Sequence, residues 1–366
     1  MPIENRKKHR EAALKAWETI KTNKREKAAR NTKKLTPFIA PYRIQKVKHP
    51  ELTIFKEVEP VWKGNRIVVP FHKTPSTIAC GKFWELRWAY GCPLDCSYCY
   101  LRGATRGRMK PQYVKTTYVL EALAEAFCKI REPTIFNAGE LSDALMNPSM
   151  MAEIVKKFGD QCKHKIYLLT KFGVKNVQFL LDSLNKQVIC AWSINAFPVA
   201  KLWENAAPSP DERIEAASQV SKKGYDTRVR IDPIFPIAGW KTHYNNLVRQ
   251  IMSSFRPDRI ILGTPRGLWK TIKYAEKSGV DMSWTQFFRE DSGWGKKLAF
   301  RQREEIYRFL YDLLDSMGYP LSQVSICKET SDMWEALGLQ FTPGLCNCYG
   351  SKAFSKDHAV NKGLSG

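Results

Sequence analysis

The chain has 366 residues, enough to bury a sizeable core in one large domain or two modest ones. Its 59 Lys and Arg residues outnumber 36 Asp and Glu residues, and the net charge of +23 indicates a polyanionic partner such as nucleic acid, with solubility alone as the alternative. No stretch is typical of a secretion signal or a membrane span, so we expect a cytoplasmic protein without structural disulfides among its ten cysteines.

The first 34 residues form a strongly basic segment, with twelve Lys or Arg residues and four Glu residues. Several alanines and Leu14 favour helix, so we predict that residues 1–36 are a helical or partly ordered arm that grips phosphate groups. A solvated tail without a partner is the alternative. Pro37 then breaks any helix, and residues 37–82 are predicted to be a leading segment that packs on the following domain.

A β-rich segment at residues 83–90 is predicted to be the first strand of that domain, and a helix is predicted at 117–130. From residue 134 onward, short β-rich runs alternate with amphipathic helical stretches. The predicted strands are 134–139, 165–172, 188–196, 226–234, 259–264 and 323–327, and the predicted helices between them are 148–159, 174–185, 210–224, 244–255 and 304–318. This alternation predicts an α/β fold with a partial (β/α)6-type barrel over residues 83–335.

One helix start is marked by a capping box, in which Ser209 precedes Pro210 and Glu212, and Gly224 follows the helix. Residues 265–300 fit the alternating pattern poorly and are predicted to form a helix plus a long aromatic loop. Because the loops after parallel strands meet at one end of a sheet, we expect the functional residues at that end.

Three cysteines, Cys92, Cys96 and Cys99, lie on the loop that follows the first predicted strand. Four thiolates complete an iron–sulfur site or a zinc ribbon, so a set of three leaves one position open. A four-iron cluster held by three thiolates has one iron that can bind an exchangeable ligand, as catalytic zinc keeps a position for substrate. Three buried thiols or a zinc site are the alternatives.

The Cys-x-x-x-Cys-x-x-Cys spacing on this loop resembles the signature of the radical S-adenosylmethionine (SAM) superfamily. The resemblance implies a radical SAM barrel with a [4Fe–4S] cluster on these three cysteines. It also implies that the open iron binds the amino and carboxylate groups of SAM, whose reductive cleavage gives a 5′-deoxyadenosyl radical that abstracts hydrogen. An external one-electron donor such as flavodoxin or ferredoxin is implied as a partner.

Within that superfamily the chain is similar to spore photoproduct lyase over roughly residues 85–350. The similarity rests on the stretches "GCPLDCSYCYL", "FNAGELSDAL", "LLTKF", "WSIN" and "RIDPI". It implies a set of side chains around SAM: Ser142, Asp143, Lys171, Ser193 and Asn195. Lys171 can pair with the SAM carboxylate, and Asp143 can accept from its ammonium group or ribose. Tyr98 and Tyr100 resemble the tyrosine pair that relays hydrogen near the substrate in these lyases.

One position departs from the pattern of these lyases. They carry a cysteine two residues before the Ser-Asp pair, which returns a hydrogen atom to the product radical, whereas this chain has Glu140. A carboxylic acid cannot take that role, because its O–H bond is much stronger than an S–H bond. Gly139-Glu140 instead resembles the glycine-glutamate element with which other radical SAM enzymes hold the SAM amino group. The repair reaction is therefore in doubt, and Glu140 joins the candidate SAM-binding residues.

A basic segment without any acidic residue follows the cluster motif directly. Its predicted nucleic-acid contacts are Arg102, Arg106, Arg108, Lys110 and Lys115. Three of them stand within nine residues of Cys99, so we expect them beside the open iron, where they suit a phosphate backbone or a nucleotide. Eleven Trp and fourteen Tyr residues offer stacking platforms for unstacked bases. A solvated basic loop is the alternative.

Residues 336–366 form a C-terminal segment that contains a Cys-x-Cys pair, Cys346 and Cys348. Together with Cys327, at the end of a predicted strand, this pair is a candidate second metal site or redox couple. Cys80 is a candidate fourth ligand only by elimination. The remaining cysteines lie at apolar helix or strand positions and are predicted to be buried thiols: Cys128, Cys162 and Cys190.

The residues and the resemblance together predict a monomeric radical SAM enzyme that abstracts hydrogen from a nucleobase or nucleotide of DNA or RNA. Modification, isomerisation or lyase cleavage would follow. Three alternatives stay open: a true spore-photoproduct DNA repair lyase, a radical SAM enzyme acting on a peptide or small metabolite, and a non-catalytic iron–sulfur or zinc protein that binds nucleic acid. The basic arm and loop favour nucleic acid over a peptide or metabolite.

Overall fold

The computed structural model describes residues 63–71, 74, 78–80, 83–292 and 294–339, all within one compact unit, Pro60–Gly366. The predicted arm at residues 1–36 lies outside the described residues, as do most of the leading segment and the pair Cys346 and Cys348. The predicted domain boundaries therefore stay predictions.

The central element is an eight-stranded sheet in which seven parallel strands follow one another in chain order. The seven are β3 (Trp84–Leu86), β6 (Ile135–Asn137), β7 (Lys165–Thr170), β8 (Val188–Ser193), β9 (Asp226–Ile231), β10 (Arg259–Leu262) and β14 (Val324–Ile326). β1 (Val68–Pro70) is added at the edge, antiparallel to β3. The predicted α/β fold with parallel strands is confirmed, and among the described residues no pairing joins β1 to β14 to close the sheet.

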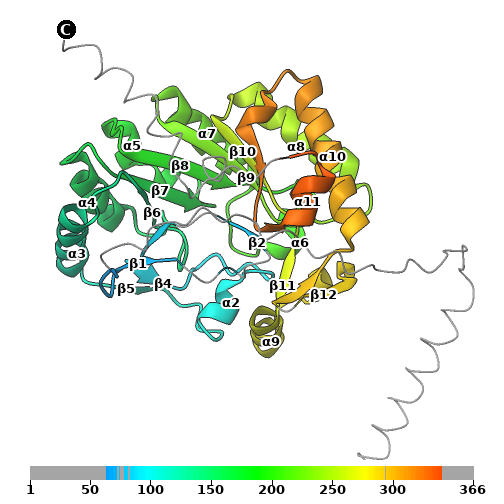
Figure 1. Cartoon of the computed structure of the whole chain (residues 1–366), viewed down its shortest axis with the longest axis horizontal. Helices are drawn as coiled ribbons and strands as arrows, with labels where there is room; N and C mark the ends of the chain where they lie inside the picture. The colour runs from blue at the N-terminus through cyan, green and yellow to red at the C-terminus, as the bar shows by residue number, and fades with distance from the viewer. Residues whose placement is uncertain (1–62, 72–73, 75–77, 81–82, 293, 340–366) are drawn as a thin grey trace, which may run out of the picture. The chain divides into compact units, whose positions relative to one another are not determined.

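Helices between the strands, and one after the last strand, lie around the outside of the sheet (Figure 1). They are α3 (Thr116–Lys129), α4 (Pro148–Gly159), α5 (Gln178–Asp182), α6 (Phe197–Trp203), α7 (Pro210–Lys222), α8 (Trp240–Ser254), α10 (Phe300–Ser316) and α11 (Ser331–Ala336). α7 begins with the predicted capping box, because Ser209 and Glu212 each accept a hydrogen bond from the backbone N–H of the other. The helix predicted at 174–185 is shorter, a 3-10 turn at Val174–Asn176 followed by α5.

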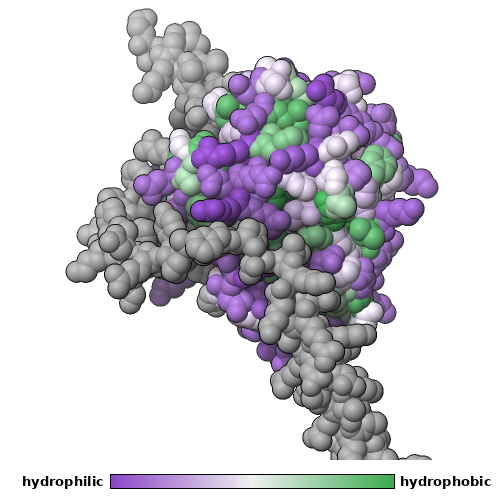
Figure 2. All heavy atoms as spheres, turned by 90° about the vertical axis from the view of Figure 1, so that its right-hand side faces the viewer, coloured by the Kyte–Doolittle hydropathy of each residue, from purple (hydrophilic) through white to green (hydrophobic). Residues whose placement is uncertain are grey.

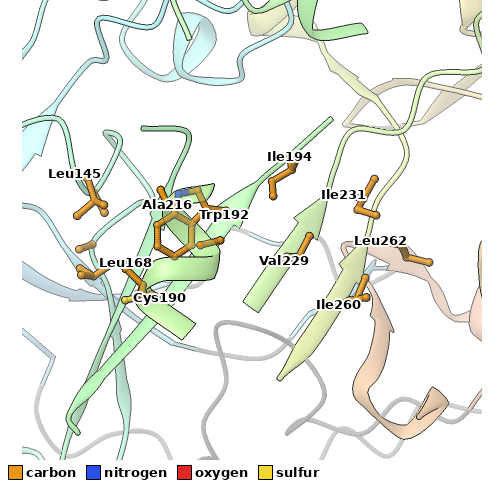
Figure 3. Close-up of a cluster of buried hydrophobic side chains, with 14 of the residues drawn as sticks. Leu145, Leu168, Cys190, Trp192, Ile194, Ala216, Val229, Ile231, Ile260 and Leu262 are labelled. Carbon is orange, nitrogen blue, oxygen red and sulfur yellow. The ribbon is translucent and has the colours of Figure 1, made fainter. Parts of the chain in front are cut away.

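Alternation along the strands divides the core between the two faces of the sheet. Figure 3 shows the face toward the helices, to which the strands contribute Leu168, Cys190, Trp192, Val229, Ile231, Ile260 and Leu262. On the other face Tyr167, Ile189 and Ala191 pack with Phe71 and Phe83. Nearly all of these side chains are apolar on both faces, which explains why the strands are continuous hydrophobic runs in the sequence.

The segment predicted as one strand at 83–90 forms two. After β3 the chain leaves the main sheet, and β4 (Ala89–Tyr90) pairs antiparallel with β5 (Gln112–Tyr113). Gly91 follows with a φ of 81°, and a Cβ atom there would lie 2.7 Å from the Met109 carbonyl oxygen. Only glycine fits such a position, so this residue turns the chain into the cysteine loop.

Residues 265–300 also differ from the prediction, since part of this region forms short strands. β11 (Arg266–Leu268), β13 (Gly295–Lys297) and β12 (Glu290–Ser292) form a three-stranded antiparallel sheet, and α9 (Trp269–Lys277) is the predicted helix. α9 packs against α2 (Leu101–Ala104), where a Cβ atom on Gly103 would lie 2.8 Å from the Thr271 nitrogen. Figure 1 shows α2, α9 and the small sheet together below the main sheet.

The exposure of two cysteines corrects one further prediction, that Cys128 and Cys162 are buried thiols. Cys190 is buried as expected, but Cys128 and Cys162 are exposed, because one lies on the solvent side of α3 and the other in the loop after α4. Figure 2 shows a face on which hydrophilic side chains predominate, with smaller hydrophobic areas between them. None of the described helices has the length and apolar character that crossing a bilayer requires.

Candidate active site

A cavity of about 230 Å³ lies where the loops after the parallel strands meet. Its wall contains most of the side chains that the sequence predicts to be functional: Cys92, Cys96, Tyr98, Cys99, Tyr100, Glu140, Ser142, Asp143, Lys171, Ser193 and Cys327. These residues come from five separate stretches of chain. The fold therefore assembles the predicted cofactor site in one place.

Cys92 and Cys96 form a small buried cluster with Leu94 and Leu101, and the partly buried Cys99 packs against it. Burial raises the pKa of all three thiols, and the nearby charge of Asp143 further raises the pKa of Cys92. Thiolates are therefore unfavourable here unless a metal replaces the protons. Three clustered cysteines, two of them buried, fit a cluster ligand role, since iron binds the deprotonated sulfur.

The structure corrects the prediction that Arg102 contacts nucleic acid. Its side chain is 1% exposed and forms an ion pair with Asp95 at 2.7 Å. Its Nε donates to the carbonyl of Cys96 at 3.1 Å, and its Nη2 donates to the carbonyl of Asp95 at 3.1 Å. The guanidinium therefore fixes the backbone of the cysteine loop and is not available to a phosphate.

Asp143 organises the strand ends beside the cysteines. Its carboxylate accepts from the Thr170 hydroxyl at 2.7 Å and from the backbone N–H of Lys171 at 2.8 Å. Burial raises the pKa of Asp143, although these hydrogen bonds oppose the shift. Next to it, the Ser142 hydroxyl is buried and has no hydrogen-bond partner among the described residues. A buried, unsatisfied hydroxyl in a cavity wall is suited to a bound polar group.

Lys171 is anchored by a carboxylate that sequence reasoning missed. Its Nζ donates to the Ser193 hydroxyl at 2.6 Å and lies 3.5 Å from Oε1 of Glu204. Glu204 is fully buried and also pairs with Arg213 at 2.5 Å. Despite burial, Lys171 and Arg213 keep the pKa of Glu204 below its ordinary value. No motif surrounds Glu204 in the sequence, so only the fold reveals its role.

The two tyrosines have different environments. The Tyr98 hydroxyl donates to Glu204, and its ring lies 5.9 Å from the Lys171 ammonium and packs on Phe235. Tyr100 is 37% exposed, and its hydroxyl donates to the backbone carbonyl of Glu140. Tyr98 is thus held within the ion-pair network, whereas Tyr100 stands at the opening of the cavity.

Glu140 lies in the cavity wall near the end of β6. Its carboxylate is 3.8 Å from the Lys328 ammonium and accepts from the Asn137 side chain at 3.4 Å. Burial lowers the pKa of Lys328, but Glu140 and the neighbouring thiols raise it on balance. The two side chains therefore face each other as a charged pair in the cavity.

A further group of charged side chains in the wall was missed in the sequence. Arg230 and Arg266 both hold Asp232, at 2.6 Å and 2.8 Å. Burial opposes ionisation, yet Arg266 and Arg230 together lower the pKa of Asp232 to about 2. A Cβ atom on Gly263 would lie 2.4 Å from the Asp232 carboxylate carbon, so this glycine makes room for the group.

Asn195, a predicted SAM-binding residue, is not in the cavity wall. Its side chain is fully buried, donates to the Pro233 carbonyl at 2.8 Å and accepts from the Tyr244 hydroxyl at 2.8 Å. The structure thus places it behind the site, where it joins the loop after β8 to the loop after β9.

A second, larger hollow of about 870 Å³ adjoins the cavity and shares Tyr100, Leu268 and Trp294 with it. Its basic lining residues are Arg87, Arg106, Arg108, Lys110 and Lys270, and no Asp or Glu of the described chain lines it. Tyr90 and Trp269 add exposed aromatic rings, at 39% and 46%. We call this hollow the basic groove. Lys115 does not line it; its ammonium lies 5.8 Å from the Tyr118 ring.

The predicted second metal site cannot be placed as a unit, because Cys346 and Cys348 lie outside the described residues. Cys327 and Cys80 both line the cavity. Within the described part of the chain, no group of three or more His, Cys, Asp or Glu side chains is arranged to hold a single metal ion. A four-iron cluster is a different case, since each of its thiolates binds a different iron atom.

Two comparisons relate this chain to known sequences. A family model for spore photoproduct lyase matches residues 75–260, just over half of the chain. Spore photoproduct lyase of Bacillus subtilis strain 168 is 32% identical over 184 residues, which are 48% of this chain and 52% of that protein. The Clostridium acetobutylicum enzyme is 28% identical over 175 residues, 46% and 51% of the two chains. The match thus spans about half the length of these curated relatives.

Solved structures of spore photoproduct lyase have a fold similar to that of this chain. Spore photoproduct lyase complexed with dinucleoside spore photoproduct has a TM-score of 0.56 at 20% identity, over 66% of this chain and 75% of that chain. A mutant of spore photoproduct lyase with bound AdoMet and dinucleoside spore photoproduct has a TM-score of 0.55 at 21% identity, over 65% and 74%. At such identities the structural likeness shows the fold alone. Because the family model covers more than half of the sequence, this chain belongs to the spore photoproduct lyase family of the radical SAM superfamily.

Proposed function

We propose that the protein is a radical SAM enzyme that abstracts hydrogen from a nucleobase or nucleotide of DNA or RNA. Modification, isomerisation or lyase cleavage of that base would follow. One observation carries the proposal: the cavity that contains the three cluster cysteines and Lys171 adjoins a basic groove with no acidic lining residue among those described. The site proposed for the cofactors thereby lies next to a surface whose positive charge suits a negatively charged substrate.

The residues of the cavity fit the cofactors of this family. The three clustered thiols suit a [4Fe–4S] cluster, and the Ser142 hydroxyl, which has no partner among the described residues, suits a bound polar ligand. Lys171 and Ser193 would hold the SAM carboxylate, while Asp143 and Glu140 would accept from its ribose and ammonium. When bound, the cluster and SAM supply the radical chemistry, and the protein supplies orientation.

The basic groove suits the substrate that we propose. Arg106, Arg108, Lys110 and Lys270 can neutralise backbone phosphates, and Trp269 can stack on a base that has left the helix. Such a base would pass Tyr100 and Trp294, which belong to both hollows, to reach the cavity. Tyr98 and Tyr100 are candidates for relaying hydrogen near it.

Repair of spore photoproduct is the second candidate, and the bound ligand of the related lyase structures favours it. Glu140 argues against it, because the lyases have a cysteine at this position and a carboxylic acid does not donate a hydrogen atom in its place. We therefore place base modification first.

Anaerobic reconstitution with iron and sulfide, followed by SAM and reductant, tests the enzyme class through release of 5′-deoxyadenosine. No release would favour a non-catalytic nucleic-acid-binding protein. Mass spectrometry of nucleosides from DNA and RNA incubated with the active enzyme then tests the substrate. Release that is stimulated only by peptides or small metabolites would overturn the nucleic-acid assignment. The electron donor, the monomeric state and the cytoplasmic location stay predictions.

A further inference from the structure

Two thiols besides the motif cysteines belong to the cavity wall, Cys80 and Cys327, and the proposed function gives them no role. Cys327 follows β14 directly, at the carboxyl end of the last parallel strand, and is 3% exposed. It lines the same cavity as the three motif cysteines. Its backbone N–H donates to the Leu262 carbonyl at 2.8 Å, which continues the pairing of β10 with β14 by one residue and fixes the position of Cys327.

The chain turns sharply after Cys327. Lys328 adopts a φ of 53°, a left-handed conformation that is unfavourable for a lysine. This turn takes the chain from β14 into β15 (Glu329–Thr330), which pairs with β2 (Ile78–Ala79) outside the main sheet. Both Cys327 and Lys328 line the cavity, so the strained turn serves to present two successive side chains there.

Three side chains, Arg230, Arg266 and Glu140, make polar contacts with this turn. Nη2 of Arg230 donates to the Cys327 sulfur at 3.0 Å, and Nη1 of Arg266 donates to the Cys327 carbonyl at 3.3 Å. Lys328 pairs with Glu140 at 3.8 Å. Arg230 and Arg266 are themselves joined through Asp232. Arg230 therefore fixes the sulfur itself, while Arg266 and Glu140 fix the turn that carries it, and a defined position is what a reacting group requires.

We propose that the Cys327 thiol is a catalytic hydrogen-atom donor to a carbon radical formed in this cavity. The inference rests on the proposed function, because it needs a radical to be generated there. An S–H bond is weaker than the C–H bonds of nucleosides, so transfer from sulfur to carbon is downhill. Cys92, Cys96 and Cys99 cannot serve, since they are the cluster ligands.

The S–H bond of Cys327 breaks homolytically, a C–H bond forms on the substrate, and the unpaired electron passes from carbon to sulfur. The resulting thiyl radical returns to the thiol by taking one electron from a one-electron donor protein of the ferredoxin or flavodoxin class and one proton from water.

Hydrogen on sulfur exchanges with solvent, whereas hydrogen on carbon does not, which gives a direct test without knowledge of the substrate. The reconstituted enzyme is incubated with SAM and dithionite in D₂O, and deuterium in the released 5′-deoxyadenosine is measured by mass spectrometry. We expect a deuterated fraction in the wild type that falls several-fold in Cys327→Ala and in the shape-conserving Cys327→Ser. Cys128→Ala, an exposed thiol outside the cavity, is the control and should match the wild type.

Each other outcome counts against a specific part of the proposal. An unchanged deuterated fraction in both Cys327 variants overturns the donor role. A fraction that follows Cys80→Ala instead assigns the role to the other unassigned thiol of the cavity wall and also overturns it. Absence of 5′-deoxyadenosine in the wild type, with the cluster intact by iron analysis, overturns the proposed function together with this inference.

A second measurement needs no turnover. SAM bound to the unreduced enzyme should slow the modification of Cys327 by N-ethylmaleimide, as measured by peptide mass spectrometry, because the sulfur faces the cavity. Modification of Cys128 should be unaffected by SAM. Equal labelling of Cys327 with and without SAM would place its sulfur away from the reacting atoms and contradict the proposal.

Discussion

The Oε2 atom of Glu204 lies 2.5 Å from the Nη2 atom of Arg213, and both side chains are completely buried. The other carboxylate oxygen receives the Tyr98 hydroxyl and lies 3.5 Å from the Lys171 ammonium. One buried carboxylate thus connects the cysteine loop, the lysine after β7 and α7. Removing its charge would leave a buried guanidinium without compensation, which is far more costly than losing a surface ion pair.

We therefore expect Glu204→Gln to lower the free energy of unfolding by about 3–5 kcal/mol. Urea denaturation of the cluster-free protein measures this change. The matched control is Asp160→Asn, which removes an exposed ion pair with Lys157 at 3.7 Å and should cost about 1 kcal/mol or less. If both variants lose the same small amount, the buried pair does not hold the site together.

Asp232 should make the protein sensitive to acid. Its pKa falls from an ordinary value of 3.8 to about 2, because Arg266 and Arg230 outweigh the effect of burial. A carboxylate with a lowered pKa stabilises the folded state above its unfolded pKa, and this contribution is lost as the pH falls from about 4 to about 2. The shift corresponds to about 2 kcal/mol of stability.

Stability measured between pH 6 and pH 2 tests this prediction with Asp232→Asn. The variant should be less stable than the wild type at pH 6, and its stability should fall less steeply between about pH 4 and pH 2. Two parallel curves over that range would contradict the lowered pKa of Asp232.

The cluster assignment predicts a brown anaerobic protein with about four iron atoms per chain. Cys96→Ala should lose this chromophore and the iron, because two thiolates do not hold the cluster. Cys128→Ala should keep both, since that thiol is exposed and distant from the motif in sequence. Iron content that survives Cys96→Ala would contradict the assignment. About eight iron atoms would indicate a second cluster at the C-terminal cysteines, and a Cys327 thiolate bound to it could not be the hydrogen donor.

The parts of the fold that could be predicted from the sequence are those with local causes. Continuous apolar runs predicted the parallel strands, because strands covered on both faces have no polar side. The capping box predicted the first residue of α7, since Ser209 and Glu212 are three residues apart. The cysteine spacing likewise lies within eight residues.

Features that depend on distant partners could not be predicted. Glu204 meets Lys171 from another loop, and Asp232 meets Arg266 only after β10 has returned to its side. Arg102 resembled its basic neighbours in the sequence, and only the position of Asp95 distinguishes it. The strands β12 and β13 have three residues each, too few for a pattern to be detected.

The basic groove predicts a charge-dependent affinity for nucleic acid. A triple substitution of Arg106, Arg108 and Lys110 to alanine should weaken binding to a single-stranded oligonucleotide and reduce the slope of log K against log salt by about 2. Fluorescence anisotropy over a range of salt concentrations measures the slope. The control is a double substitution of Lys222 and Lys223, exposed residues at the end of α7. An equal effect of the two changes would show non-specific attraction without a groove.

Variants of Glu140 distinguish two roles for this residue: binding of SAM, or mere replacement of the cysteine that donates hydrogen in the repair lyases. If its carboxylate accepts from the SAM ammonium, Glu140→Gln should weaken SAM binding roughly tenfold to a hundredfold, the value of a charge-assisted hydrogen bond of about 1.5–3 kcal/mol. Iron content should stay unchanged, and Glu121→Gln, an exposed glutamate of α3, should bind SAM normally. Equal affinity in Glu140→Gln would mean that the residue only replaces a donor, and Glu140→Cys should then gain activity on dinucleoside spore photoproduct. Efficient formation of thymidine by the unmodified enzyme would overturn our choice of base modification over repair.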